Sequence, residues 1–148
     1  MLHLNAAIIA VAVATSCFAS TDSDTGRVVG IISTGERVPT IEAPDTVRAG
    51  AAFGAVVNTF GSSTCTMPDG VELTLGPAEA RVVPYDLETT NPGEGFACTA
   101  DLAPRPHPVE LRFTEVGLAR IVAAGTVVGE ETRERKPGEV MKAVVVVP

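Results

Sequence analysis

The sequence predicts an all-β domain built as a sandwich of two sheets, and three observations carry this prediction. After residue 26, short apolar segments alternate with turn residues at intervals of about eight to twelve positions. Several segments alternate apolar and polar residues with a period of two, as a strand with one buried face requires. No stretch in this region has the apolar spacing of a helix.

The first half of the domain contains a series of predicted strands separated by turn residues. Their apolar segments cover residues 28–32, 46–48, 53–60, 71–75 and 78–82. Residues 71–75 alternate Val, Leu and Leu with Glu and Thr, which predicts one buried and one exposed face. The sequence Pro68-Asp69-Gly70 before them predicts a turn, because proline fixes φ and glycine accepts a positive φ.

The second half continues in the same style. A loop at 91–95 precedes Phe96–Cys98, which is expected to enter the next strand, and residues 109–113 give the clearest strand pattern in the chain. Thr114–Gly117 predicts a tight hairpin into a strand at 118–123. The charged run at 130–136 predicts an exposed loop before a final strand at 140–147.

The N-terminal segment has the features of a secretory signal peptide. Residues 6–14 are apolar and end in small residues, and this stretch is too short to span a bilayer as a helix. The sequence Ala14-Thr15-Ser16-Cys17 resembles the lipobox of bacterial lipoproteins, which implies that Cys17 is lipidated and becomes the new N-terminus. Ordinary cleavage after Ala14 or Ala19 is the alternative.

These features divide the chain into a signal peptide at 1–16, a flexible tether at 17–26 and a β-sandwich domain at 27–148. The expected location is the bacterial cell envelope, with the lipid on Cys17 as the membrane partner. The residue after Cys17 is Phe18 and not an acidic retention signal. By resemblance to lipoprotein sorting, this favours the outer membrane. A periplasmic or secreted protein is the alternative.

The cysteine count is consistent with export. If Cys17 is lipidated or removed, Cys65 and Cys98 remain as a pair in an oxidising compartment. A disulfide between them closes a loop of about 34 residues, which contributes roughly 3–4 kcal/mol in the chain-entropy model. Two free buried cysteines are the alternative.

The pattern of segments resembles the immunoglobulin-like domains of secreted bacterial proteins. The resemblance rests on residues 41–50, on Phe53–Val57, on the cysteine pair around the middle strands and on Val109–Phe113. It covers residues 41–147 and implies an antiparallel Ig-like sandwich. The chain lacks the Trp and the Tyr before the second Cys that mark antibody-type domains.

Charge excludes one class of partner. The chain has 11 Lys and Arg against 18 Asp and Glu, with a formal net charge of −7. Since a negative surface repels phosphate backbones and no basic stripe is present, nucleic acid is not an expected partner.

The search for chemistry yields no catalytic or metal site. His107 is the only histidine after the signal peptide, so a copper centre with two His ligands is excluded and no cofactor is expected. Prolines flank His107 and predict an exposed loop residue. A triple of Ser62 or Ser63, His107 and Asp86 or Asp101 is conceivable, but the second glycine of a nucleophile elbow is missing.

The sequence therefore predicts a non-catalytic binding, adhesion or envelope-structure module. Phe60 and Tyr85 are candidates for a recognition surface, although the Tyr85 ring has the core as its alternative place. The final strand, apolar at every position from 143 to 147, is either buried or paired with another chain. The alternative function is a soluble module that binds a small ligand or inhibits a protein.

Overall fold

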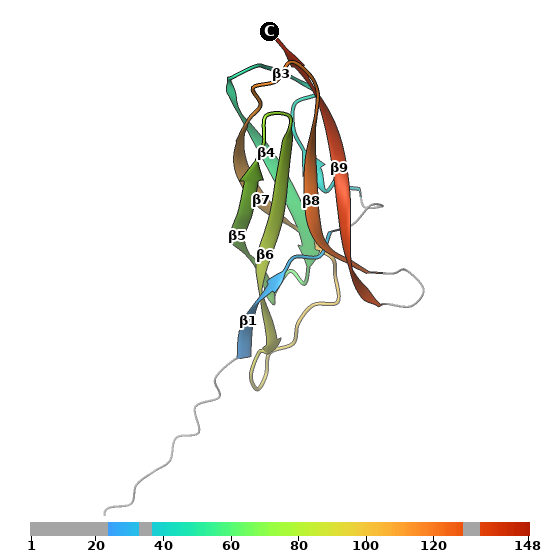
Figure 1. Ribbon diagram of the computed structural model, residues 1–148. Helices are drawn as coiled ribbons and strands as arrows, with labels where there is room; N and C mark the ends of the chain where they lie inside the picture. The colour runs from blue at the N-terminus through green and yellow to red at the C-terminus, as the bar shows by residue number, and fades with distance from the viewer. Residues whose placement is uncertain (1–23, 33–36, 129–133) are drawn as a thin grey trace, which may run out of the picture.

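The computed structural model describes residues 24–32, 37–128 and 134–148, which fold into two packed β-sheets (Figure 1). The predicted signal peptide, Cys17 and the tether up to residue 23 lie outside the described residues. The described part of the chain contains no helix, and so none that is long and apolar enough to cross a membrane. The all-β sandwich predicted from the sequence is confirmed.

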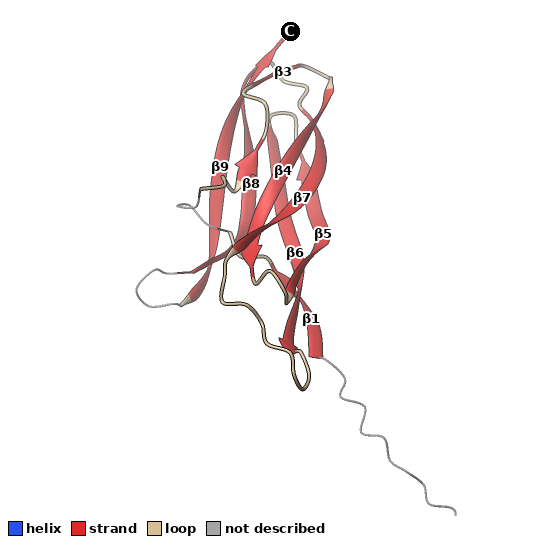
Figure 2. Ribbon diagram, turned by 180° about the vertical axis from the view of Figure 1, so that it is seen from behind, coloured by secondary structure: helices blue, strands red, loops and turns tan. Residues whose placement is uncertain are grey.

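The described chain consists of strands joined by loops (Figure 2). They are β1 (Asp24–Val29), β2 (Ile41–Glu42), β3 (Thr46–Arg48), β4 (Ala52–Gly61), β5 (Thr66–Leu75), β6 (Glu79–Asn91), β7 (Ala103–Arg112), β8 (Gly117–Val128) and β9 (Arg135–Val147). The larger sheet has the order β1-β6-β8-β9-β3, with β5 also paired to β6, and the smaller sheet has the order β2-β4-β7.

Two pairs of strands are parallel, which differs in detail from the antiparallel sandwich expected. β3 pairs with the end of β9, and the start of β6 pairs with β8 through Glu79↔Arg120 to Val82↔Ala123. β6 and β8 run in the same direction because the chain crosses to β7 in the other sheet and returns between them. Thr114–Gly117 belongs to this return crossing, so the predicted hairpin at this position is wrong.

The core lies between the inner faces of the two sheets. Its largest fully buried side chains include Phe113, Leu111 and Ile121, and the Phe53 ring lies 5.5 Å from that of Phe113. The alternation predicted for 109–113 is confirmed in β7, where Val109 and Leu111 are buried while Glu110 and Arg112 are exposed. Burial of these apolar surfaces is the main force that holds the sheets together.

Several strands have bounds other than those expected. β1 begins at Asp24, within the segment predicted as a tether, and β9 begins at Arg135. The turn predicted at Pro68–Gly70 is a bulge inside β5, since the register with β6 shifts between Pro68 and Val71. Phe96–Cys98 lies in the connection before β7 rather than in a strand. Residues 129–133 of the predicted charged loop lie outside the described residues.

The prediction of an exposed loop for His107 is wrong. His107 is 2% exposed and lies within β7, paired with Val57 of β4. Pro104, Pro106 and Pro108 occupy alternate positions of this edge strand, so the positions without an N–H group face away from β4. The ladder with β4 therefore stays intact, and the outer edge of β7 has no N–H donor at these three positions.

The predicted disulfide is confirmed. Cys65, before β5, is bonded to Cys98 in the connection between β6 and β7. Beside the bond, the Oγ1 atom of Thr99 lies 2.9 Å from both the Ser62 and Ser63 hydroxyl oxygens. The disulfide and these hydroxyls thus join two loops at one end of the sandwich.

Asp101 adds a charged contact to the same joint. The backbone N–H of Ser63 donates to Asp101 Oδ1 at 3.0 Å. This bond and a further one from the Thr99 hydroxyl lower the pKa of Asp101 to about 2, because both stabilise the carboxylate.

Replacing both bonded cysteines by serine is expected to lower the free energy of unfolding by about 3–4 kcal/mol, because the unfolded chain loses a cross-link over 33 residues. Denaturant unfolding measures the change. Reduction of the unaltered protein is the matched control and should give a similar loss. A loss below about 1 kcal/mol in both samples would contradict this role for the bond.

Asp101→Asn is expected to change how stability depends on acid. Because the pKa of Asp101 is lower in the folded state, its contribution is full above about pH 3.8 and is lost as pH falls through about 2. The variant should be less stable than the parent protein near pH 5 and should approach its stability as the pH falls to about 2. Unfolding curves at a series of pH values measure the difference. Glu94→Gln, which removes a charge from the same connection but not this contact, should leave the pH profile unchanged.

Candidate functional site

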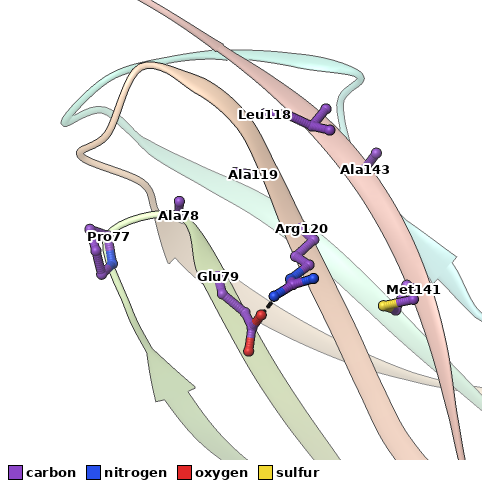
Figure 3. Close-up of a pocket in the computed structure, with 8 residues that line it drawn as sticks. All are labelled: Pro77, Ala78, Glu79, Leu118, Ala119, Arg120, Met141 and Ala143. Carbon is purple, nitrogen blue, oxygen red and sulfur yellow. Dashed lines mark hydrogen bonds and ion pairs between the residues drawn. The ribbon is translucent and has the colours of Figure 1, made fainter.

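An apolar groove lies on the outer face of the larger sheet, where β6, β8 and β9 run side by side (Figure 3). Its volume is about 480 Å³. The groove is lined by Pro77, Ala78, Glu79, Leu118, Ala119, Arg120, Met141 and Ala143. Leu118 is 74% exposed and Met141 is 65% exposed, so two large apolar side chains on this face contact water.

The alternation of β9 explains how the groove forms. Val144 and Val146 point into the core and are buried, while Met141, Ala143 and Val145 point outward and are exposed. Leu118 of β8 is the register partner of Val145. The apolar segment at 143–147 therefore points alternate side chains into the core and toward the outer face of the sheet. The predicted burial holds for only half of these side chains.

The charged groups at the groove neutralise one another. Arg120 donates to the Glu79 carboxylate inside the groove, as Figure 3 shows. Next to them, Arg81 Nη1 lies 2.6 Å from Glu139 Oε1. Since each cation is paired with an anion, the groove presents apolar surface with no unpaired charge among the residues described, which suits an apolar partner.

The two aromatic residues predicted as a recognition surface lie elsewhere. Phe60 is 2% exposed and borders a smaller cavity of about 130 Å³ beside the disulfide. The Tyr85 ring is half-buried, with the Arg27 guanidinium 3.8 Å from its centroid, and its hydroxyl donates to Glu72 Oε2 at 3.3 Å. The structure does not bring Phe60 and Tyr85 together on one surface. The groove residues were missed, although the unbroken apolar run at 143–147 was the signal that could have revealed them.

A cluster of polar side chains is buried between the two sheets. Thr59 of β4, Asp86 of β6 and His107 of β7 are each at most 2% exposed. His107 Nε2 lies 3.0 Å from Asp86 Oδ1 and 3.1 Å from Thr59 Oγ1. Gly30 passes so close that a Cβ at this position would lie 2.3 Å from Thr59 Cγ2. The cluster therefore requires glycine at position 30.

Both nitrogens of the His107 imidazole have hydrogen-bond partners. His107 Nδ1 lies 3.2 Å from the Gly70 carbonyl oxygen, which only accepts, so Nδ1 donates to it. The Thr59 hydroxyl donates to the Arg105 carbonyl at 3.4 Å, which leaves its oxygen to accept from Nε2. The imidazole of His107 thus has a polar partner at both of its nitrogens, and Asp86 and Thr59 share Nε2.

This arrangement differs from that of a nucleophile, a base and an orienting acid. In a catalytic relay, the acid and the nucleophile contact opposite nitrogens of the imidazole. Here Asp86 and Thr59 contact the same nitrogen, and the other nitrogen faces the backbone. The cluster joins strands of both sheets through charge-assisted hydrogen bonds, which is a structural role.

The residues of the conceivable serine triple are divided between two places. His107 and Asp86 do meet in the core. Ser62 and Ser63 lie instead at the loops beside the disulfide, with Thr99 and Asp101. Among the described residues, no group of three or more His, Cys, Asp or Glu is placed to hold a metal ion.

Asp86→Ala is expected to lower the free energy of unfolding by about 3–5 kcal/mol, because it leaves the buried imidazole of His107 without its hydrogen-bonded carboxyl partner. Thermal and denaturant unfolding measure the loss. Glu79→Ala, which breaks the exposed ion pair with Arg120, is the control and should cost less than about 1 kcal/mol. Equal losses in the two variants would contradict the role assigned to the buried pair.

Comparisons with protein-family models, with curated proteins and with solved structures find no match for this chain. The function must therefore be argued from its own residues.

Proposed function

We propose that this protein is an exported module, anchored to the membrane by a lipid on Cys17, that binds a protein partner through the groove on β6, β8 and β9. The observation that carries the proposal is the exposure of Leu118 and Met141 on a sheet face hollowed by about 480 Å³. The signal-peptide features of residues 1–16 and the disulfide support export.

The chemistry of the groove favours an apolar segment of a protein as the partner. The ion pair Arg120–Glu79 lies inside the groove between the apolar side chains, and the pair Arg81–Glu139 lies next to it, so each cation is already neutralised. A charged ligand would find no unpaired group among these residues.

The position of the groove suits display away from a membrane. β6 begins at Glu79 in the groove, and its last residue, Asn91, pairs with Asp24, the first residue of β1. A strand of 13 residues extends about 40 Å. A lipid on Cys17 would therefore hold the chain at one end and leave the groove near the other (Figure 1).

A photoreactive amino acid at position 118, introduced in the native host, tests the groove directly. We expect a cross-linked product of defined mass from position 118. The same group at position 75 is the matched control, because Leu75 is also exposed but does not line the groove. Cross-links that are absent at 118, or identical at both positions, would contradict binding at the groove.

Binding of a small apolar ligand is the second candidate function. The groove volume lies within the range of small-molecule sites, about 300–1,000 Å³. The same experiment separates the two candidates, since a small ligand adds only its own mass to the labelled protein whereas a protein partner adds that of a second chain.

A further inference from the structure

The connection between β6 and β7 exposes an aromatic side chain at the end of the sandwich where β1 begins. Phe96 is 75% exposed, and Leu102 in the same connection is 57% exposed. Gly93 and Gly95 before Phe96 have φ values of 86° and 83°, a region that residues with a side chain rarely adopt. The backbone of this loop is thus shaped by glycine, and it places a large apolar ring in water.

The loop lies beside the point where the N-terminal segment joins the domain. Asp24 pairs with Asn91, and the loop begins at the next residue, Pro92 (Figure 1). Seven residue steps separate Cys17 from Asp24. Because an extended chain spans at most about 3.6 Å per residue, Cys17 lies within roughly 25 Å of this end of the sandwich.

We propose that the Phe96 loop is a second membrane contact, which inserts its ring into the interface of the bilayer that holds the lipid of Cys17. This inference rests on the lipid anchor of the proposed function. A lipid on Cys17 would hold the domain at the bilayer, so the loop would meet the membrane interface at a high effective concentration. Phe and Leu side chains of segments that lie on a membrane are buried at the boundary between headgroups and acyl chains.

The charges near the loop limit how deep this contact reaches and which lipid it suits. Glu94 lies two residues before Phe96, and the whole chain is acidic. A carboxylate is costly to place among acyl chains, so the loop stays at the headgroup level. Because anionic lipids repel an acidic surface, the contact fits a zwitterionic bilayer.

The absence of tryptophan from the chain makes the contact measurable. Phe96→Trp gives a protein with a single tryptophan, and since residue 96 is exposed the substitution leaves the fold unchanged. The test uses the chain from Cys17 to Pro148, which contains every described strand. With Cys65 and Cys98 bonded, Cys17 is its single free thiol, and a maleimide lipid couples it to phosphatidylcholine vesicles.

We expect the tryptophan emission of the tethered Phe96→Trp variant to shift to the blue and to be quenched by brominated phosphatidylcholine. Leu118→Trp is the matched control, because Leu118 is equally exposed and lies in the groove at the far end. Its emission should not change. Unchanged emission from the Phe96→Trp variant, or equal quenching of both variants, would overturn the proposal.

The chemical tether makes this test independent of lipidation in the cell. If the tryptophan introduced at position 96 enters the bilayer but the native protein carries no lipid, the loop inference holds as a property of the tethered domain and the anchor in the proposed function fails. If the native protein is lipidated but this tryptophan stays in water, the anchor holds and the loop inference fails.

Discussion

Strand β6 is the element on which the rest of the structure depends. One of its edges pairs with β5 along most of its length, and the other pairs with β8 at its start and with β1 at its end. Its 13 residues therefore satisfy backbone hydrogen bonds to three other strands. The same strand contributes Glu79 to the groove, Asp86 to the core and Asn91 to the pairing with the first described residue.

The contact between Asp86 and His107 ties this strand to the opposite sheet. Apolar packing is not directional and fixes the relative position of two sheets only loosely, whereas a buried hydrogen bond requires a defined distance and angle between its two groups. Thr59 and the Gly70 carbonyl complete the hydrogen bonds of the imidazole. The three polar side chains thus fix how the sheets face each other near the end that carries the disulfide and the tether.

The sequence predicted the class of fold and the covalent bond, but not the site. The alternation in 109–113 was enough to predict strands, and the two cysteines left after export were enough to predict the disulfide. Neither prediction requires the order of the strands in the sheets. The burial of His107 was missed because flanking prolines indicate a loop unless the strand is known to lie at a sheet edge. The crossing at 114–117 was missed because a short connection does not reveal which sheet follows. The groove was missed because predicting it requires knowing that Leu118 of β8 lies beside Val145 of β9 in the larger sheet.

In the proposed function, the protein is attached to the membrane near one end of β6 and binds its partner in the groove near the other end. The intact mass of the protein extracted from native membranes, beside a Cys17→Ala control, tests this account most directly. The account predicts a mass that includes a diacylglyceryl group and an acyl chain on Cys17, with both absent from the control. An unlipidated mass that matches cleavage after Ala14 or Ala19 would contradict it, because the sandwich would then have no anchor from which to display its groove.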